Sequence, residues 1–168
     1  SIPTLDRRLG RSMGPRAATP QRRLDAVRQL TAAGCPVTVM FAPVIPGLND
    51  HELERVLEAS ADAGATGAGY VLVRLPLEIS ELFQQWLATD HPDRAARVMS
   101  LIRQTRGGKD YVSQWGERQR GAGPVADLVA RRFAAARARC GLDSPRRTFD
   151  LDQFRVPPKP GDQMSLFD

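Results

Sequence analysis

The sequence predicts an α/β fold in which parallel strands alternate with helices. Two apolar runs support this, and we expect the first strand at Val37–Phe41 and the second at Gly69–Leu75. Between them lie a turn with two prolines and a glycine, then a helical pattern that ends at Gly64. A continuous apolar run is typical of a strand that is buried on both faces. A strand–helix–strand unit with short connections makes the two strands parallel neighbours with a right-handed crossover.

The first part of the chain contains helix signals. Leu5–Met13 is expected to form a short helix. Thr19 and Pro20 suit the N-cap and the first position of a second helix, and Gly34 is expected to end it.

The turn after the first strand, residues 42–50, lies where α/β enzymes bind ligands. Asn49 is a good N-cap, and Glu52 three residues later completes a capping-box pattern. The turn is therefore expected to point free backbone N–H groups toward whatever lies above the strand ends. The alternative is that this segment is simply a well-capped connection between strand and helix that binds no ligand.

Alternation along the second strand assigns its side chains to two faces. In a barrel, the outer face meets helices and favours branched apolar residues. This places Tyr70, Leu72 and Arg74 toward the interior, with Arg74 near the mouth at the carboxyl end. A buried arginine needs an anionic partner from protein or ligand. The alternative is an arginine that is exposed at the end of the strand.

After Pro76 the pattern becomes helical and basic. Helices are expected at Ile79–Leu87, Pro92–Arg106 and Pro124–Cys140. Residues 107–123 are a loop rich in glycine and charge that also carries tyrosine and tryptophan. From His91 to Arg147 there are thirteen Lys and Arg residues against five Asp and Glu residues. Such a block is either a solvated helical face or a contact for nucleic acid, on whose bases the loop aromatics could stack.

Composition limits the class of protein and of partner. The net charge of +5 and the isoelectric point near 10.0 favour a polyanion such as nucleic acid. No apolar run is long enough to span a membrane, so no membrane partner is expected. Cys35 and Cys140 make no disulfide framework, which indicates a reducing cytoplasm. Because Cys35 precedes its strand, we expect it to be a packed core thiol.

Two strands leave unpaired sheet edges, so the fold requires further strands. Ser1–Asp6 has the character of the end of an earlier element, and the chain does not begin with Met. We therefore expect additional strands on polypeptide that precedes Ser1.

Several segments, in the right order, resemble one protein family. They are RAATPQRRLDAVRQLTAAGCPV, APVIPGLND, GYVLVRLP and RVMSLIRQTRGGKDYVSQWGERQRGAGP. Together they resemble the C-terminal half of bacterial radical S-adenosylmethionine (SAM) proteins. The branch is the one grouped with spore photoproduct lyase and called DNA repair photolyase-like, and the resemblance covers nearly the whole chain.

The resemblance implies the C-terminal portion of a partial (β/α)6 TIM-like barrel with a helical C-terminal extension. It divides the chain into residues 1–76 of the barrel, a basic helical extension at 77–148 and a tail at 149–168. It also implies SAM and a [4Fe–4S] cluster as cofactors, which yield a 5′-deoxyadenosyl radical that abstracts hydrogen from substrate. The C-x3-C-x2-C loop that holds the cluster is absent, so this chain alone is expected to be inactive and to hold no metal.

The resemblance also assigns residues to the site. Two are candidates on the substrate side, Tyr70 and Arg74. The remainder are candidates for contact with the cofactor: Ser1, Thr4, Arg16, Val44, Ile45, Gly47 and Asn49.

The C-terminal tail carries a short peptide that resembles the signal with which bacterial repair and replication proteins bind the DNA sliding clamp. Gln163 would bind at one end of a groove, and Leu166 with Phe167 would fill an apolar pocket. The alternative is an amphipathic end that folds back on the domain.

Three functions remain open on the sequence alone. The first is a radical SAM enzyme of the DNA-repair lyase type. The second is a non-catalytic module that binds nucleic acid or the clamp, and the third is a related radical enzyme that acts on protein or RNA.

Overall fold

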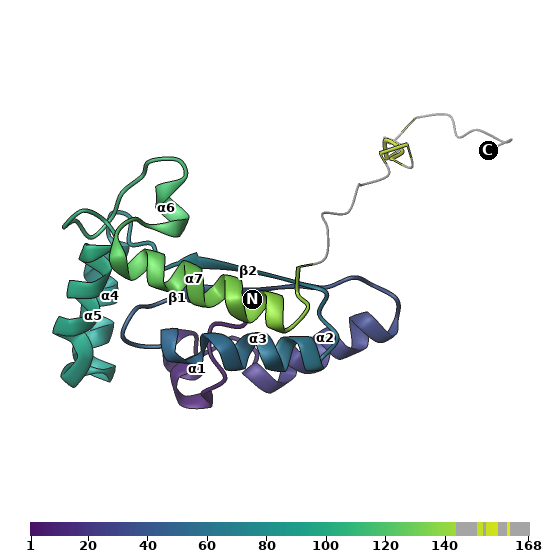
Figure 1. Ribbon diagram of the computed structural model, residues 1–168, viewed down its shortest axis with the longest axis horizontal. Coiled ribbons are helices and arrows are strands. Elements are labelled where there is room, and N and C mark those ends of the chain that lie inside the picture. The colour runs from purple at the N-terminus through teal and green to yellow at the C-terminus, as the bar shows by residue number, and fades with distance from the viewer. Residues whose placement is uncertain (144–150, 153, 158–160, 162–168) are drawn as a thin grey trace, which may run out of the picture.

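The structure, a computed structural model, describes residues 1–143, 151–152, 154–157 and 161 (Figure 1). Seven helices, two strands and one 3-10 helix follow one another in this part of the chain. They are α1 (Arg7–Met13), α2 (Pro20–Ala32), β1 (Thr38–Val44), η1 (Asp50–Glu52), α3 (Leu53–Asp62), β2 (Gly67–Leu72), α4 (Ile79–Asp90), α5 (Pro92–Gln104), α6 (Glu117–Arg120) and α7 (Pro124–Arg139).

The two strands are parallel neighbours that are joined through α3, which confirms the predicted α/β class. Phe41 lies opposite Tyr70, and Val44 lies opposite Leu72 after an irregularity in the register. β1 is longer than expected and β2 ends earlier. The pairing nevertheless continues past the strand, because the Val73 N–H donates to the Val44 carbonyl at 2.8 Å.

The N-terminal segment runs beside β1. The Ile2 N–H donates to the Met40 carbonyl at 2.9 Å, and both Ile2 and Thr4 are buried. The described sheet itself has two strands. This arrangement is consistent with part of a TIM-like fold.

Helices cover one face of the sheet. Figure 1 shows α3 and α7 side by side along the strands, and Phe41, Val56 and Val129 belong to the core that they share with the sheet. On the opposite face, Met40 and Val71 are only partly buried. The sheet is therefore closed by helices on one side and open on the other.

The predicted facing of β2 was wrong for two residues. Tyr70 and Leu72 point into the helix-covered core, and the Tyr70 ring centroid lies 4.7 Å from that of Phe133 on α7. Both faces of β2 carry apolar residues, so alternation alone could not tell which face the helices cover. The partner ring lies about 60 residues further along the chain, beyond the reach of a strand pattern.

A second core lies past the carboxyl ends of the strands, where α4 and α5 pack as a pair (Figure 1). It joins Leu9 of α1 and Ile45 of the turn to Leu87 and Val98 of the helix pair. Gly47 in the turn has a φ of +79°, and a Cβ there would lie 2.8 Å from Leu101 Cδ1. Close packing of α5 on the turn therefore requires glycine at this position.

Cys35 is exposed, so its prediction as a core thiol was wrong. It lies in the connection between α2 and β1, where residues 33–36 are all exposed. The apolar residues on either side suggested burial, but the connection runs over the surface. In the described part of the chain, no helix is both long and apolar enough to cross a membrane.

Two ion pairs join α3 to α7. Arg132 donates from Nε and Nη2 to the two carboxylate oxygens of Glu54, at 2.8 and 2.7 Å. The second pair, Arg139 with Glu58, is more exposed and has a single hydrogen bond of 2.8 Å. The hydrogen bond from Arg132 holds the pKa of Glu54 below its ordinary value, against the opposing effect of burial.

We predict that Arg132→Gln lowers the free energy of unfolding by about 1 kcal/mol at neutral pH, since a two-bond pair between helices is lost. The folded-state pKa of Glu54 is depressed, so the pair stabilises the protein above the ordinary carboxylate pKa. This contribution is lost as the pH falls through the folded pKa. Denaturant unfolding of both proteins from pH 7 to about pH 3 should show the difference shrinking.

Arg139→Gln is the matched control, since it removes the more exposed pair on the same two helices. It should cost less at neutral pH. A cost for Arg132→Gln that stays constant down to the lowest pH would contradict the assignment.

Candidate functional site

Asn49 organises the turn after β1 and is fully buried. Its Oδ1 accepts from the Ile45 N–H at 2.7 Å. Its Nδ2 donates to the carbonyls of Pro3 at 2.8 Å and Pro43 at 2.9 Å. Asn49 occupies the N-cap position of η1, as predicted, but its side chain makes no cap hydrogen bond to the following helix. The side chain turns back into the turn and joins it to the N-terminal segment.

The predicted capping box was wrong, because the Glu52 carboxylate has other partners. Its Oε1 accepts from Thr4 Oγ1 at 2.6 Å, and its Oε2 accepts from the Leu5 N–H at 2.7 Å. Thr4 and Glu52 are both buried. Asn49 and Glu52 therefore fasten the N-terminal segment to the turn, and the polar atoms of Thr4 are engaged in the fold.

The turn does not present the free backbone N–H groups that we expected. The Gly47 N–H donates to Asp50 Oδ1 at 2.8 Å, and those of Leu48 and Asn49 donate to the Ile45 carbonyl. The Ile45 N–H is held by Asn49, as described above. The alternative interpretation, a self-contained connection between strand and helix, accounts for these groups.

An apolar hollow of about 270 Å³ lies at the carboxyl ends of the strands, and we call it the strand-end hollow. It is lined by Ser12, Met13, Pro43, Ile45, Val73, Arg74, Leu75, Ile79, Leu82, Phe83 and Trp86. Ile45 and Arg74, which the sequence assigned to the cofactor and substrate sides, thus face one space. Its other walls come from α1 and α4, and Arg74 is the one charged residue in the lining.

Arg74 is half-buried at the mouth of this hollow, and so is not simply exposed at the end of a strand. Its Nη2 lies 3.2 Å from the Tyr111 hydroxyl, and its guanidinium carbon lies 5.9 Å from the centroid of that ring. Its Nε is buried and has no hydrogen-bond partner among the described residues, so a ligand does not reach that atom. The donor capacity for an anionic ligand rests on the two terminal nitrogens, for which the one hydrogen bond is that of Nη2 with Tyr111.

A second guanidinium, that of Arg106, raises the positive potential beside Arg74. Arg106 is only 3% exposed and donates to the carbonyls of Glu117 at 2.6 Å and Val73 at 3.1 Å. Burial, and next the nearby charge of Arg74, lower the pKa of Arg106 from its ordinary value. In the described part of the chain, no carboxylate is hydrogen-bonded to either guanidinium.

The remaining predicted residues lie elsewhere. Ser1 is exposed, and its carbonyl accepts from Arg23 Nη1 at 2.6 Å. Arg16 is exposed between α1 and α2, and Val44 is fully buried in the helix-covered core. Tyr70 is in that same core, so the structure does not bring it to the hollow with Arg74.

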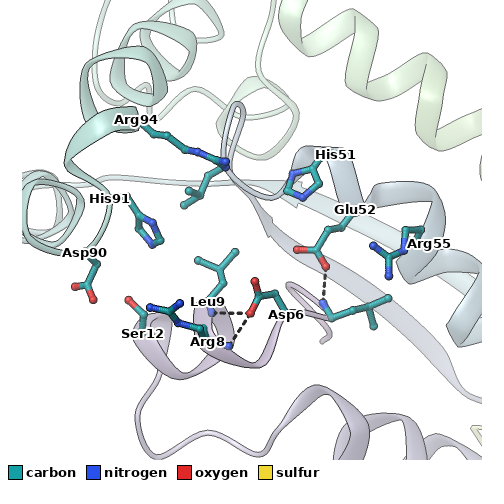
Figure 2. A pocket seen from close by; sticks show the side chains of 12 residues that line it. Asp6, Arg8, Leu9, Ser12, His51, Glu52, Arg55, Asp90, His91 and Arg94 are labelled. Carbon is teal, nitrogen blue, oxygen red and sulfur yellow. Dashed lines mark hydrogen bonds between the residues drawn. The ribbon is translucent and has the colours of Figure 1, made fainter.

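A larger pocket of about 710 Å³ was missed by sequence reasoning, and we call it the side pocket (Figure 2). Its charged and imidazole side chains are Asp6, Arg8, His51, Glu52, Arg55, Asp90, His91 and Arg94. Figure 2 shows His91 and Arg94 across the opening from Asp6 and Glu52. Asp6 caps α1 through the Arg8 and Leu9 N–H groups. These residues come from three separated segments, namely α1 with its cap, η1 with the start of α3, and the junction of α4 and α5, so no local sequence pattern indicates them.

The described residues do not fit an iron–sulfur cluster. Both cysteines are free, and no group of three or more His, Cys, Asp or Glu side chains in the described part is arranged to hold a metal ion. Such a cluster takes thiolate ligands, three of them in the loop that the family resemblance implies.

Comparison with known proteins gives one family match. Residues 1–59 match the model described as the Radical SAM superfamily. An uncharacterised protein of Mycobacterium bovis and two of Mycobacterium tuberculosis are each 36% identical over 105 residues, which is 61% of this chain and 31% of theirs. The chain thus spans about a third of the length of these relatives. No solved structure gives a significant match. The family match supports membership of the radical SAM superfamily.

We predict that Asn49→Asp lowers the free energy of unfolding by about 2 kcal/mol or more. The change removes the amide donors and sets a buried carboxylate against the carbonyls of Pro3 and Pro43. Asp50→Asn is the control, because its side-chain oxygen can still accept from the Gly47 N–H. Chemical denaturation measures both, and equal effects of the two changes would contradict the role of Asn49.

Proposed function

We propose that this chain is the C-terminal part of a radical SAM enzyme that acts on DNA as a repair-type lyase. One observation carries the proposal. The superfamily match at residues 1–59 covers α1, β1 and the turn, which build much of the strand-end hollow. The carboxyl ends of parallel strands are where barrels of this class place their active sites.

The cofactor pair of this superfamily supplies a carbon radical that abstracts hydrogen from the substrate. In our proposal the cluster thiolates come from polypeptide outside this chain. Ile45 and the aromatic side chains of α4 provide an apolar wall that excludes water from the hollow.

Thr4, Gly47 and Asn49 are assigned a positioning role, since their polar groups hold the turn rather than face the hollow. For Ser1, Arg16 and Val44, contact with the cofactor remains a proposal that rests on the family resemblance.

The proposal of DNA as the substrate rests on charge. The protein carries a net charge of +5, and Arg74 and Arg106 lie close together without a bonded carboxylate in the described part. A polyanion is electrostatically complementary to such a positive surface. A non-catalytic nucleic-acid module is the second candidate, because this basic surface would serve binding alone equally well.

We predict that the natural protein containing this chain forms 5′-deoxyadenosine from SAM. It would be purified without oxygen, supplied with iron and sulfide, and reduced. Damaged DNA should stimulate the reaction, and Arg74→Gln should reduce that stimulation about tenfold or more while leaving DNA-independent cleavage of SAM. Arg28→Gln, on the exposed face of α2, is the control for charge.

Each outcome decides between the candidates. A protein that binds DNA and holds a reduced cluster but never cleaves SAM would support the binding module. Stimulation by RNA or by protein, with none by DNA, would reject DNA as the substrate.

We further propose that the tail binds the DNA sliding clamp. Gln163, Leu166 and Phe167 lie outside the described residues, so this proposal rests on the sequence. Replacing Leu166 and Phe167 together by alanine should abolish retention of the protein on immobilised clamp, because both apolar anchors are removed. Ser165→Ala should leave retention unchanged. Retention of the double variant at the wild-type level would reject the proposal.

A further inference from the structure

The segment between α5 and α7, residues 105–123, is fastened to the rest of the protein, and we call it the arginine loop. The Ala122 N–H donates to the Thr105 carbonyl at 3.0 Å and closes its base. Asp110 is held by Arg103 at 2.6 Å and by the Ser80 hydroxyl at 2.9 Å. These contacts tie the loop to α4 and α5, so it presents its side chains from a fixed position.

The arginine loop displays an aromatic ring to solvent. Trp115 is 82% exposed, and the Arg118 guanidinium carbon lies 4.5 Å from its ring centroid. No hydrogen bond or ion pair holds the Arg118 side chain among the described residues. A large apolar ring left in water with a guanidinium beside it is a surface that a flat, electron-rich ligand can cover.

The charge around this ring is positive. Once the Arg103–Asp110 pair is set aside, the loop contains Arg106, Lys109, Arg118 and Arg120 against Glu117 alone. The Arg120 guanidinium carbon is already stacked 4.2 Å from the centroid of Tyr70. Lys109 remains for an external anion, and so does Arg118, because its guanidinium lies against the exposed Trp115 ring and makes no hydrogen bond among the described residues.

The arginine loop is joined to the lining of the strand-end hollow by two hydrogen bonds, one from Arg106 to the Val73 carbonyl and one between Arg74 and Tyr111. Tyr111 of the loop accepts the hydrogen bond of Arg74, which lines the hollow. A ligand that lies along the loop therefore reaches a second cation at the mouth of the hollow. The ligand must combine flat rings with repeated negative charge, which is the chemistry of a nucleic-acid strand.

We propose that the arginine loop binds single-stranded DNA, with one unpaired base stacked on Trp115 and backbone phosphates at Arg118 and Arg74. The strand is single because the bases of a duplex are stacked on one another and offer no free face. The proposal rests on the proposed function for its choice of DNA, and it adds the surface and the form of DNA that this surface takes.

The test measures binding by the natural protein that contains this chain, without SAM or reductant. A short oligothymidylate should quench tryptophan fluorescence, and this quenching should be absent in Trp115→Phe if the base stacks there. Trp115→Ala should weaken binding about tenfold, the loss expected when one stacked base loses its platform. Because Trp115 is 82% exposed, its truncation should not change thermal unfolding.

Two further measurements separate base from phosphate. The wild type should bind an abasic strand of equal length and charge more weakly than the oligothymidylate. Trp115→Ala should bind the two strands equally. Arg118→Gln should reduce the slope of log affinity against log salt by about 0.7, the value for one phosphate contact on a single strand. Arg28→Gln, an exposed arginine on α2, should leave the slope unchanged.

Wild-type binding by both Trp115→Ala and Arg118→Gln would overturn the proposal. Equal competition by an acidic peptide that has no rings would also overturn it, because charge alone would then explain the binding. The two proposals fail separately. If the protein cleaves SAM and the loop variants bind DNA as the wild type does, only the proposal for the loop is rejected. If the protein binds DNA through the loop but does not cleave SAM, only the proposed enzymatic function is rejected.

Discussion

The strand-end region depends on the buried side-chain amide of Asn49. Its oxygen and its nitrogen bind three main-chain groups, one of them 46 residues away at Pro3. A buried amide that loses such partners costs more free energy than one hydrogen bond contributes, so the turn and the N-terminal segment are fixed together. With the polar groups satisfied internally, Ile45 can form an apolar wall of the strand-end hollow.

The positive charge at the same end, in contrast, has no hydrogen-bonded carboxylate among the described residues. Arg106 is anchored to two carbonyl oxygens and lies against Arg74, and its pKa falls through burial and through that neighbouring charge. Carbonyl dipoles orient a guanidinium without cancelling its charge. Arg74 therefore faces the hollow beside a like charge, and an anion bound there would relieve the repulsion.

The sequence predicted the strand–helix–strand unit, the Thr19 cap and the shared location of Ile45 and Arg74, since each depends on local periodicity or on the rule that strand ends converge. Sequence-based prediction failed where the residue type suits two different structural roles. The side chain of the N-cap residue Asn49 could bond to the helix or to the turn, and only the position of Pro3 decides between them. The facing of Tyr70 depends on α7, and the side pocket depends on three separated segments, so neither leaves a local signal.

The two ends of the proposed DNA path differ in what they offer. The arginine loop presents an exposed ring with a guanidinium beside it, whereas the hollow is largely apolar and holds one cation. Nonspecific affinity for a strand can come from the loop alone, because stacking and phosphate contacts are indifferent to sequence. In the proposed path, selection of a particular base would then fall to the hollow, where Arg74 is the one charged residue of the lining. Since Tyr111 links the two through Arg74, a strand held by the loop would present its next nucleotide to the carboxyl ends of the strands, the end at which (β/α) barrels place their active sites.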